Sequence, residues 1–595
     1  MNFRHMRDAA TDLVLWVDAV CINQLDKEEK SHQVALMGHI YRQCRQVRIW
    51  LGCDDSQCDL KRSSCPTSNT DHSLRKADPF ELLRILANPG SVCEGLCSNA
   101  DKFNTMWQGF LAIEQSSWWT RIWTAQEAVL PWEGVFYFDR WTISRRDLNM
   151  CGWNYLRPCP LMAQCCQHAI SRLPDTARTT LDGFCSIVQS FDDTRIFHPG
   201  KDRNVPHDLQ SVHIRFGYRA CSDPRDKVYG LLGIAEDRLL RADYQLSKEK
   251  VFFLATYRML CSAGGSLKNL TGHQYGPAPG KLASWVRDFD APSDRMDADI
   301  TWERYYYLIS RTYDASRGHK SSHILLGTLP RSAGGTAQVG LRVVARRVGK
   351  VAKVSSEAQT CNSHKDAGTQ KHVFKQWVLQ ALDWGDSDIA AFLDLPDSAQ
   401  KKSSNLMGFW HTILGGKDIP ARFEGFIEAY FNHIPPTTMH WLKLFLAWLT
   451  DEDGTLKSEL YHYIRLMTHG RCYFNTEDNG QGLCYPHARI GDEVWVLDGG
   501  NVPFILRSTY LGSKERNTSR PMGTHEFGSN ERVGTPLTRK LRHLLSASHL
   551  KLSRALHHGY AVGYYQLIGD CYFDGYMYGA AVRDSQIHAQ SIVLV

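Results

Sequence analysis

The chain lacks several features that would assign it to a familiar class of protein. It opens with the polar run "MNFRHMRDAATD" and not with an apolar, cleavable leader, so we expect no secretory signal. Its longest strongly apolar run, "WLKLFLAWL" at residues 441–449, is about half of what a helix needs to cross a bilayer. We therefore expect no membrane span, a cytoplasmic location and reduced thiols for the 18 cysteines.

The common signatures of enzymes and cofactor sites are also missing. There is no G-x-x-x-x-G-K-[ST], and no G-x-G-x-x-G follows a strand signal, so no phosphate cradle is visible. G-x-S-x-G and H-E-x-x-H are absent too. The five cysteines between residues 53 and 97 form no C-x-x-C pair, which leaves little basis for a zinc site. We expect no cofactor and no metal.

Charge imbalance is confined to one segment. The formal net charge is +6, and residues 512–559 carry nine Lys or Arg against three Asp or Glu. A nucleic-acid-binding domain would spread basic residues over a whole face. We therefore interpret this segment as a solvated basic insert and do not expect nucleic acid to be a partner.

The chain has enough apolar matter for several cores. Its 595 residues, 43% of them hydrophobic, exceed what one compact core holds. Pattern changes along the chain predict four parts: an α/β domain over 1–150, a mainly helical extension over 151–325, a mixed and then helical region over 326–467, and a strand-rich module over 468–595 that contains the basic insert.

The first of these parts alternates strand and helix signals. Leu13 to Ala19 is rich in β-branched and aromatic residues, which predicts a strand buried on both faces. Asp26 followed by Glu29 has the spacing of a capping box ahead of an apolar helical stripe. "VRIWLG", residues 47–52, predicts the next strand, and such a strand–helix–strand unit favours parallel pairing. "WWTRIWTAQEAVL" then predicts a short helix that leads into the strand "GVFYF".

Two carboxylates in this part suggest chemistry. Asp18 falls near the predicted strand end, where open α/β sheets place ligands, and Arg121 is its candidate partner. The alternative is an Asp that accepts backbone N–H bonds in its own turn. Glu127 follows three tryptophans, which can desolvate a carboxylate and raise its pKa; the alternative is core packing with a bond to an arginine. For Cys21 we expect a packed thiol.

Three segments together resemble the successive signatures of the fungal heterokaryon incompatibility (HET) domain. They are "LWVDAVCINQLDKEEKSHQVALMGHIYRQCRQVRIWLG", "WWTRIWTAQEAVL" and "DPRDKVYGLLGIA". The strand-rich tail also resembles that of large HET-domain proteins. The candidate catalytic residue is Glu127, and the pocket or motif residues are Trp16, Asp18, Cys21, Asn23, Gln24, Arg121, Trp123, Gln126, Asp223, Pro224, Arg225 and Asp226.

The chain departs from the family pattern at its start. Family members begin with a strand and a Ser-Tyr-x-Trp-Gly type motif, whereas "MNFRHMRDAA" resembles the helix that follows. We therefore expect the first strand to be missing, either because the gene model begins late or because the chain is a degenerate member.

The resemblance implies a role in fungal nonself recognition and programmed cell death, and a flavodoxin-like or TIR-like parallel sheet. We expect an interaction module that self-associates or binds a protein partner. One alternative is an enzyme that cleaves an NAD-like substrate with Glu127, because some TIR domains hydrolyse NAD with a helix-borne Glu. Fold alone does not fix function, and an inactive paralogue is the third interpretation.

Overall fold

The chain folds into two compact units. Unit 1 contains residues 1–251 and 289–298, and unit 2 contains residues 252–288 and 299–595. A computed structural model describes residues 14–53, 77–88, 100–156, 173–195, 208–236, 240–272, 282–321, 324–329, 338–358, 367–395, 404–416, 438–451, 458–509 and 563–595. Within these ranges, no helix is long and apolar enough to cross a membrane.

The predicted strand over Leu13 to Ala19 is wrong for its described residues. Residues 14–17 pair with no strand among the described residues, and a short helix α1, Asp18–Cys21, follows. Val14 and Val20 are 97% and 74% exposed. An apolar run becomes a buried strand only where neighbouring strands pair with it, and here local bonds such as Cys21 N to Val17 O, 2.8 Å, are formed instead.

The helix predicted after Asp26 is confirmed as α2, Lys27–Gln43. The Asp26 side chain caps it by accepting from the backbone N–H groups of Glu28 and Glu29. Glu29 departs from the capping box, because its Oε1 accepts from Asn23 N at 3.0 Å. The apolar stripe packs inward, with Val34, Met37 and Tyr41 buried.

A three-stranded mixed sheet follows α2 in unit 1. Its order is β1 (Val47–Gly52), β2 (Gly134–Phe138) and β3 (Trp141–Ser144). β1 and β2 are parallel, while β2 and β3 are antiparallel. The parallel pairing predicted between residues 13–19 and 47–52 is wrong for the described residues, because residues 14–17 form no strand. The predicted helix before β2 is confirmed as a 3-10 turn, η5 (Ser117–Thr120), followed by α6 (Thr124–Val129).

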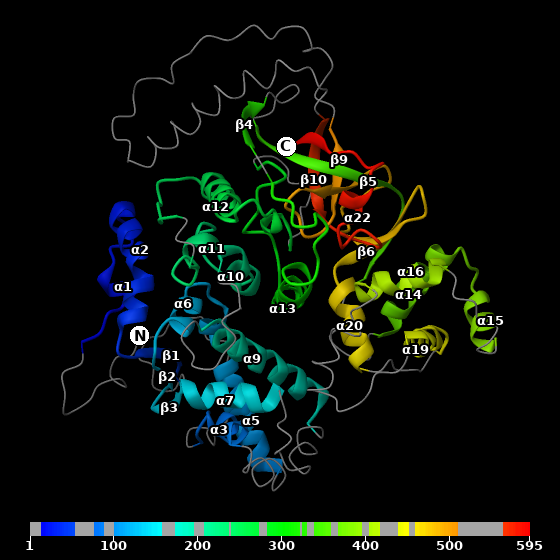
Figure 1. The fold of residues 1–595 in the computed structure, drawn as a ribbon. Coiled ribbons are helices and arrows are strands. Elements are labelled where there is room, and N and C mark those ends of the chain that lie inside the picture. Colours follow the sequence, from blue (N-terminus) through cyan, green and yellow to red (C-terminus); the bar gives the residue numbers. More distant parts are fainter. Residues whose placement is uncertain are drawn as a thin grey trace, which may run out of the picture. The chain divides into compact units, whose positions relative to one another are not determined.

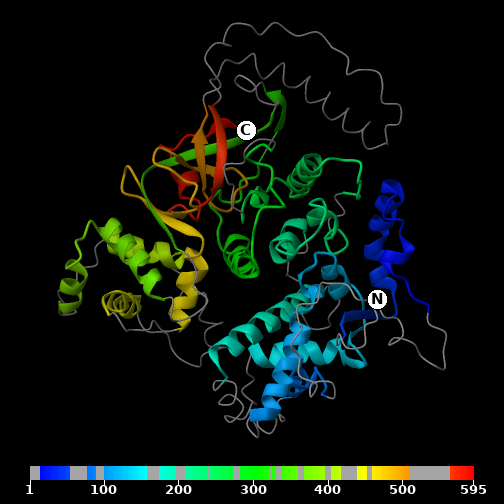
Figure 2. The ribbon, with the colours of Figure 1, turned by 180° about the vertical axis from the view of Figure 1, so that it is seen from behind.

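Helices make up most of the rest of unit 1. α3 (Glu81–Ala87), α5 (Ala100–Glu114), α7 (Arg145–Leu156) and α9 (Asp175–Thr194) pack together, as both ribbon views show (Figure 1 and Figure 2). An aromatic cluster joins this group to the sheet: Trp119 stacks on Phe136 of β2 at 5.7 Å and meets Phe184 of α9 at 5.0 Å. The helices are α3 (Glu81–Ala87), α5 (Ala100–Glu114), α7 (Arg145–Leu156), α9 (Asp175–Thr194), α10 (Leu209–Phe216), α11 (Asp226–Tyr229), and the starts of α12 (Lys248–Ser262) and α13 (Arg295–Glu303).

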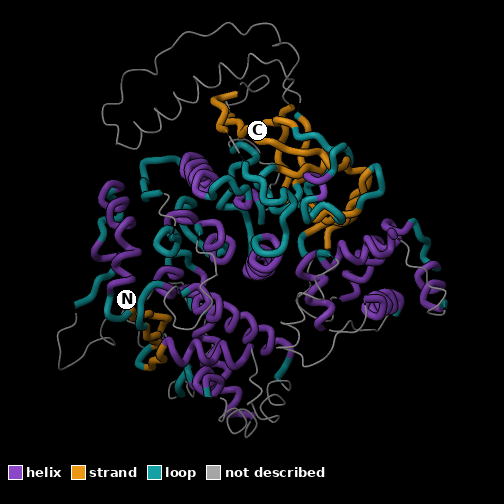
Figure 3. The backbone as a smooth tube through the Cα atoms, viewed as in Figure 1, coloured by secondary structure: helices purple, strands orange, loops and turns teal. Residues whose placement is uncertain are grey.

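Unit 2 is built around a closed ring of strand pairs. β5 (Gln338–Ala358) pairs with β12 (Gln590–Leu594), β12 with β10 (Gly563–Asp570), β10 with β9 (Phe504–Ser508), β9 with β8 (Glu493–Leu497), and β8 again with β5. The ring is a small barrel filled by residues such as Val348, Val494 and Ile568. The predicted strand-rich tail is thereby confirmed (Figure 3).

The long strand β5 also carries a second set of strands. Its last third pairs with β6 (Arg471–Thr476), which continues to β7 (Gln481–Cys484) and β11 (Tyr572–Phe573), and its first third pairs with β4 (Ile324–Leu329).

Helices complete unit 2, and several of them confirm the helical pattern predicted for the later part of residues 326–467. They are η6 (Lys268–Leu270), the π-helix η7 (Arg304–Ile309), α14 (Ala367–Leu382), α15 (Asp388–Asp394), α16 (Ser404–Leu414), α19 (Thr438–Thr450), α20 (Ser458–Thr468) and α22 (Ala580–Arg583). The basic insert, residues 512–559, lies outside the described residues. The division into four parts stays a prediction.

Candidate functional site

Glu127 is held at its side chain and at its backbone by two other elements of unit 1. The indole Nε1 of Trp118, on η5, donates to Glu127 Oε2 at 2.8 Å. The Arg145 guanidinium, at the start of α7, donates to the Glu127 backbone carbonyl at 3.3 Å. Tyr41, on α2, lies close enough for the Glu127 charge to raise its pKa. The carboxyl group therefore has a fixed partner on η5 and lies near α2.

The electrostatic surroundings of Glu127 favour its protonated form. Burial raises the pKa of Glu127 above its ordinary value, and the Asp18 carboxylate raises it further. The hydrogen bond from Trp118 and the positive charge of Arg121 lower the pKa of Glu127 without cancelling the effect of burial. A carboxyl group that keeps its proton to higher pH is suited to act as a general acid or base.

Asp18 and Arg121 are brought into the same neighbourhood as Glu127. Burial is the main cause that raises the pKa of Tyr41. For both Tyr41 and Glu127, the negative charge of Asp18 raises the pKa and the positive charge of Arg121 lowers it. Asp18 Oδ1 also accepts from the N–H of Ala19 at 2.7 Å. This local bond agrees with the interpretation of Asp18 as a residue that fixes its own turn, and within the described residues no ion pair joins Asp18 to Arg121. We call Asp18, Tyr41, Arg121 and Glu127 the carboxylate cluster.

The other residues of the first signature shape the chain around this cluster. The Trp16 ring meets the Tyr41 ring edge-on, with centroids 6.0 Å apart. The Gln24 amide donates to the Asp18 carbonyl at 3.4 Å, and Asn23 Oδ1 accepts from Leu25 N at 3.1 Å.

The prediction that Cys21 is a packed thiol is wrong. It is a free thiol and is exposed, not packed, because the segment in which it lies forms an exposed short helix instead of a buried strand.

Trp123 and Gln126 connect α6 to the segment around α11. The Trp123 indole donates to Asp226 Oδ2 at 3.2 Å. Gln126 Nε2 donates to the Gly230 carbonyl at 2.8 Å, and Gly233 leaves no room for a Cβ beside the Gln126 side chain. These two predicted site residues therefore join α6 to the third signature.

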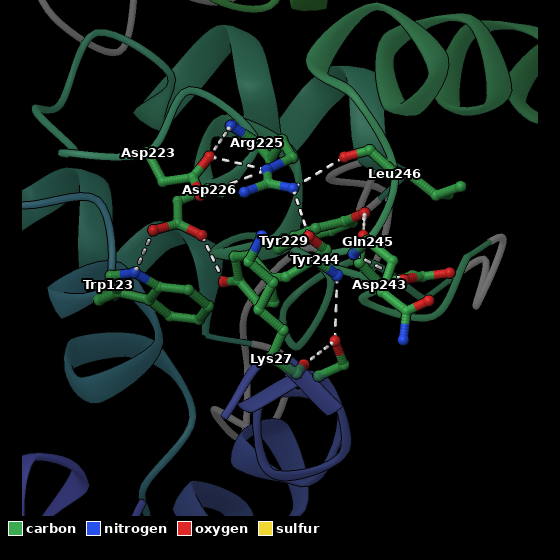
Figure 4. A network of polar contacts seen from close by, with 11 residues as sticks. Lys27, Trp123, Asp223, Arg225, Asp226, Tyr229, Asp243, Tyr244, Gln245 and Leu246 are labelled. Atoms are coloured by element: carbon green, nitrogen blue, oxygen red, sulfur yellow. Dashed lines mark hydrogen bonds and ion pairs between the residues drawn. The ribbon is translucent and has the colours of Figure 1, made fainter. Parts of the chain in front are cut away.

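The third signature, "DPRDKVYGLLGIA" at residues 223–235, forms a polar network with the chain that follows it, shown in Figure 4. Asp226 is buried and accepts from the Tyr244 hydroxyl at 2.5 Å as well as from Trp123. Asp223 pairs with Arg225 at 2.7 Å, and Arg225 donates to the backbone carbonyls of Tyr244 and Leu246, each at 2.7 Å. Pro224 begins the turn before α11, and its carbonyl accepts from Lys227 N. Every charged group here has a structural partner, so this signature fixes the chain.

Sequence reasoning missed Tyr41 and Tyr244 as site residues. Tyr41 belongs to the apolar stripe of α2, and no local pattern shows that the charge of Glu127, much further along the chain, acts on its pKa. Tyr244 lies outside all three signatures. The described residues contain no group of three or more His, Cys, Asp or Glu side chains arranged for a metal ion.

Comparison with known proteins gives one match to a family model and one to a relative. Residues 2–127 match the family model described as "Heterokaryon incompatibility protein (HET)". Over 577 residues the chain is 25% identical to "Heterokaryon incompatibility protein 6, OR allele" of Neurospora crassa (strain ATCC 24698 / 74-OR23-1A / CBS 708.71 / DSM 1257 / FGSC 987), covering 87% of this chain and 81% of that protein. No solved structure matches.

Proposed function

We propose that this chain, which is a HET domain-containing protein, acts in fungal heterokaryon incompatibility, where it takes part in nonself recognition and triggers programmed cell death. The observation that carries the proposal is the extent of the likeness: the similarity to heterokaryon incompatibility protein 6 runs over 87% of the chain. The similarity therefore extends into unit 2, beyond the residues 2–127 that match the HET family model and that we call the HET segment.

The proposed mode of action is protein interaction, either self-association or binding of a protein partner. Large apolar side chains are exposed within the HET segment: Val14 is 97% exposed, Val20 74% and Leu25 94%. Apolar surface gathered in one stretch is typical of interaction sites. We call Val14, Val20 and Leu25 the apolar edge.

The test of this role is expression in a fungus. The full chain would be induced in one strain, which is then fused with a tester strain, and dye uptake would score dead fusion cells. We expect death to rise above that of strains carrying an empty vector. Unchanged viability at equal protein levels, across tester strains of differing incompatibility type, would leave the inactive paralogue as the better interpretation.

A second candidate function is hydrolysis of an NAD-like nucleotide at the carboxylate cluster. The raised pKa of Glu127 and its position beside Asp18 and Arg121 favour this alternative. Glu127 would act as the catalytic carboxyl group, and Arg121 would face the negatively charged phosphates of the substrate. A flavodoxin-like or TIR-like sheet would agree with it and stays a prediction.

This enzyme hypothesis has its own test. Purified chain would be incubated with NAD, and release of nicotinamide would be followed over time. Glu127→Gln should abolish the activity. Glu114→Gln is the matched control, because Glu114 is a partly buried carboxyl group of the same unit whose pKa burial also raises. Equal loss in both variants, or no release by the wild type, would count against this function.

A further inference from the structure

A cavity of about 900 Å³ lies within unit 1, between α2 and the chain that follows α11. None of the carboxylate-cluster residues lines it. One wall comes from residues 31–42 of α2, and the other from residues 229–236 and 240–242. Its volume falls within the range of small-molecule sites, about 300–1,000 Å³.

The two walls are joined at both ends. At one end, Ser31 Oγ accepts from Tyr244 N at 3.0 Å and donates to the Lys27 carbonyl at 2.6 Å. At the other end, the backbones of Gly38 and Gly233 touch, since a Cβ on Gly38 would lie 2.8 Å from Gly233 Cα. The cavity is therefore a built feature of the unit.

The lining is apolar at its base and basic at its rim. Val34, Tyr229, Ala235 and Ala242 are buried lining residues. The exposed lining residues include His32, His39 and Arg241. Within the described part of the chain, none of these three side chains forms a hydrogen bond or an ion pair, so all their donors are available to a ligand.

We propose that this cavity binds a small organic anion with an apolar body and a phosphate or carboxylate group. The apolar base would hold the body of the ligand, while Arg241 and the two imidazoles would donate to its anionic group. The described residues of the lining include two arginines, Arg42 and Arg241, against one acidic residue, Glu236, which favours a negative ligand. Such a ligand would contact both α2, which lies inside the HET segment, and the second wall, which lies outside it.

The test uses probes of the stated chemistry on the full chain. Isothermal titration would compare naphthyl phosphate, naphthoate and the uncharged naphthol, so that the phosphate and carboxylate arms are separated. We expect saturable binding of at least one anion and weaker binding of naphthol. Arg241→Gln should raise the dissociation constant about tenfold, the usual effect of losing one charge-assisted hydrogen bond.

Two further variants keep the test decisive. Arg146→Gln is the matched control, because Arg146 is exposed in the same unit and does not line the cavity; its dissociation constant should equal that of the wild type. Ala35→Trp places a large ring on an exposed lining position and should abolish binding in a chain whose circular dichroism is unchanged. Absence of saturable binding of both anions, or equal binding by wild type and Arg241→Gln, would overturn the proposal.

Discussion

Asp226 is the residue on which the third signature depends. Its two carboxylate oxygens each accept a hydrogen bond, one from Tyr244 and one from Trp123. Asp226→Ala leaves both donors without this acceptor, and Tyr244 is itself buried. An unsatisfied buried polar group costs about 1–3 kcal/mol. We expect the free energy of unfolding to fall by about 2–4 kcal/mol in urea titrations. Asp175→Ala, in an exposed ion pair, should change it by less than about 1 kcal/mol.

Glu127 should make stability depend on pH. Because its folded pKa lies above the ordinary value of 4.5, the folded state retains this proton to higher pH than the unfolded state. The resulting stabilisation is present at low pH and is lost as pH rises through the folded pKa. Glu127→Gln removes this pH-dependent loss of stability, because glutamine does not titrate. The melting temperature of the variant minus that of the wild type should therefore increase from pH 4 to pH 8; a constant difference would contradict the raised pKa.

Contact between α2 and the turn after α11 depends on two glycines. Gly38 of α2 approaches Gly233 so closely that a Cβ would lie 2.8 Å from backbone. Gly38→Ala improves helix propensity by about 1 kcal/mol but forces the two backbones apart, and overpacking typically costs about 1–3 kcal/mol. We expect a net loss of stability, measured by thermal melting. His39→Ala, at an exposed position on the same helix, should be neutral, and a gain in stability for Gly38→Ala would refute this contact.

In unit 2, one buried ion pair links strands β6 and β10. Arg471 and Asp570 are 2.7 Å apart with side chains 3% and 0% exposed, and Asp570 also accepts from Gly272 N. Removing one member of such a pair costs about 3–5 kcal/mol, because the other charge stays buried. Asp570→Ala should show this loss in denaturant titrations. Glu477→Ala, which breaks an exposed pair with Lys350, should cost at most about 1 kcal/mol.

Over the whole molecule, the sequence was informative wherever a structure depends on nearby residues. The cap at Asp26, the helix after it and the strand at residues 47–52 follow from local spacing and are confirmed. The failed strand at Leu13 to Ala19 shows the limit, because burial of that run depends on strands that must come from elsewhere. Closure of the barrel could not be predicted for the same reason. β5 pairs with β12, for example through Leu341 and Leu594. These residues lie in distant parts of the chain, and no local pattern encodes their pairing.

The candidate site was predictable to the same extent. Glu127 and its tryptophans lie close together in the sequence, so their association could be inferred. Asp18 was expected to pair with Arg121. Within the described residues no ion pair joins them, and each acts separately on the pKa of Glu127. Tyr41 could not be found in this way, because its closeness to Glu127 depends on how α2 packs against α6, which no local spacing determines.

The measurement that tests the central claim most directly is the fraction of dead fusion cells in strains that express three forms of the chain. These are the wild type, the double variant Val20→Asp/Leu25→Asp in the apolar edge, and Glu127→Gln. Both edge side chains are exposed, so the double variant should fold. If the chain acts by protein interaction, the double variant loses cell killing and Glu127→Gln retains it. Full killing by the double variant at wild-type protein levels would contradict the account.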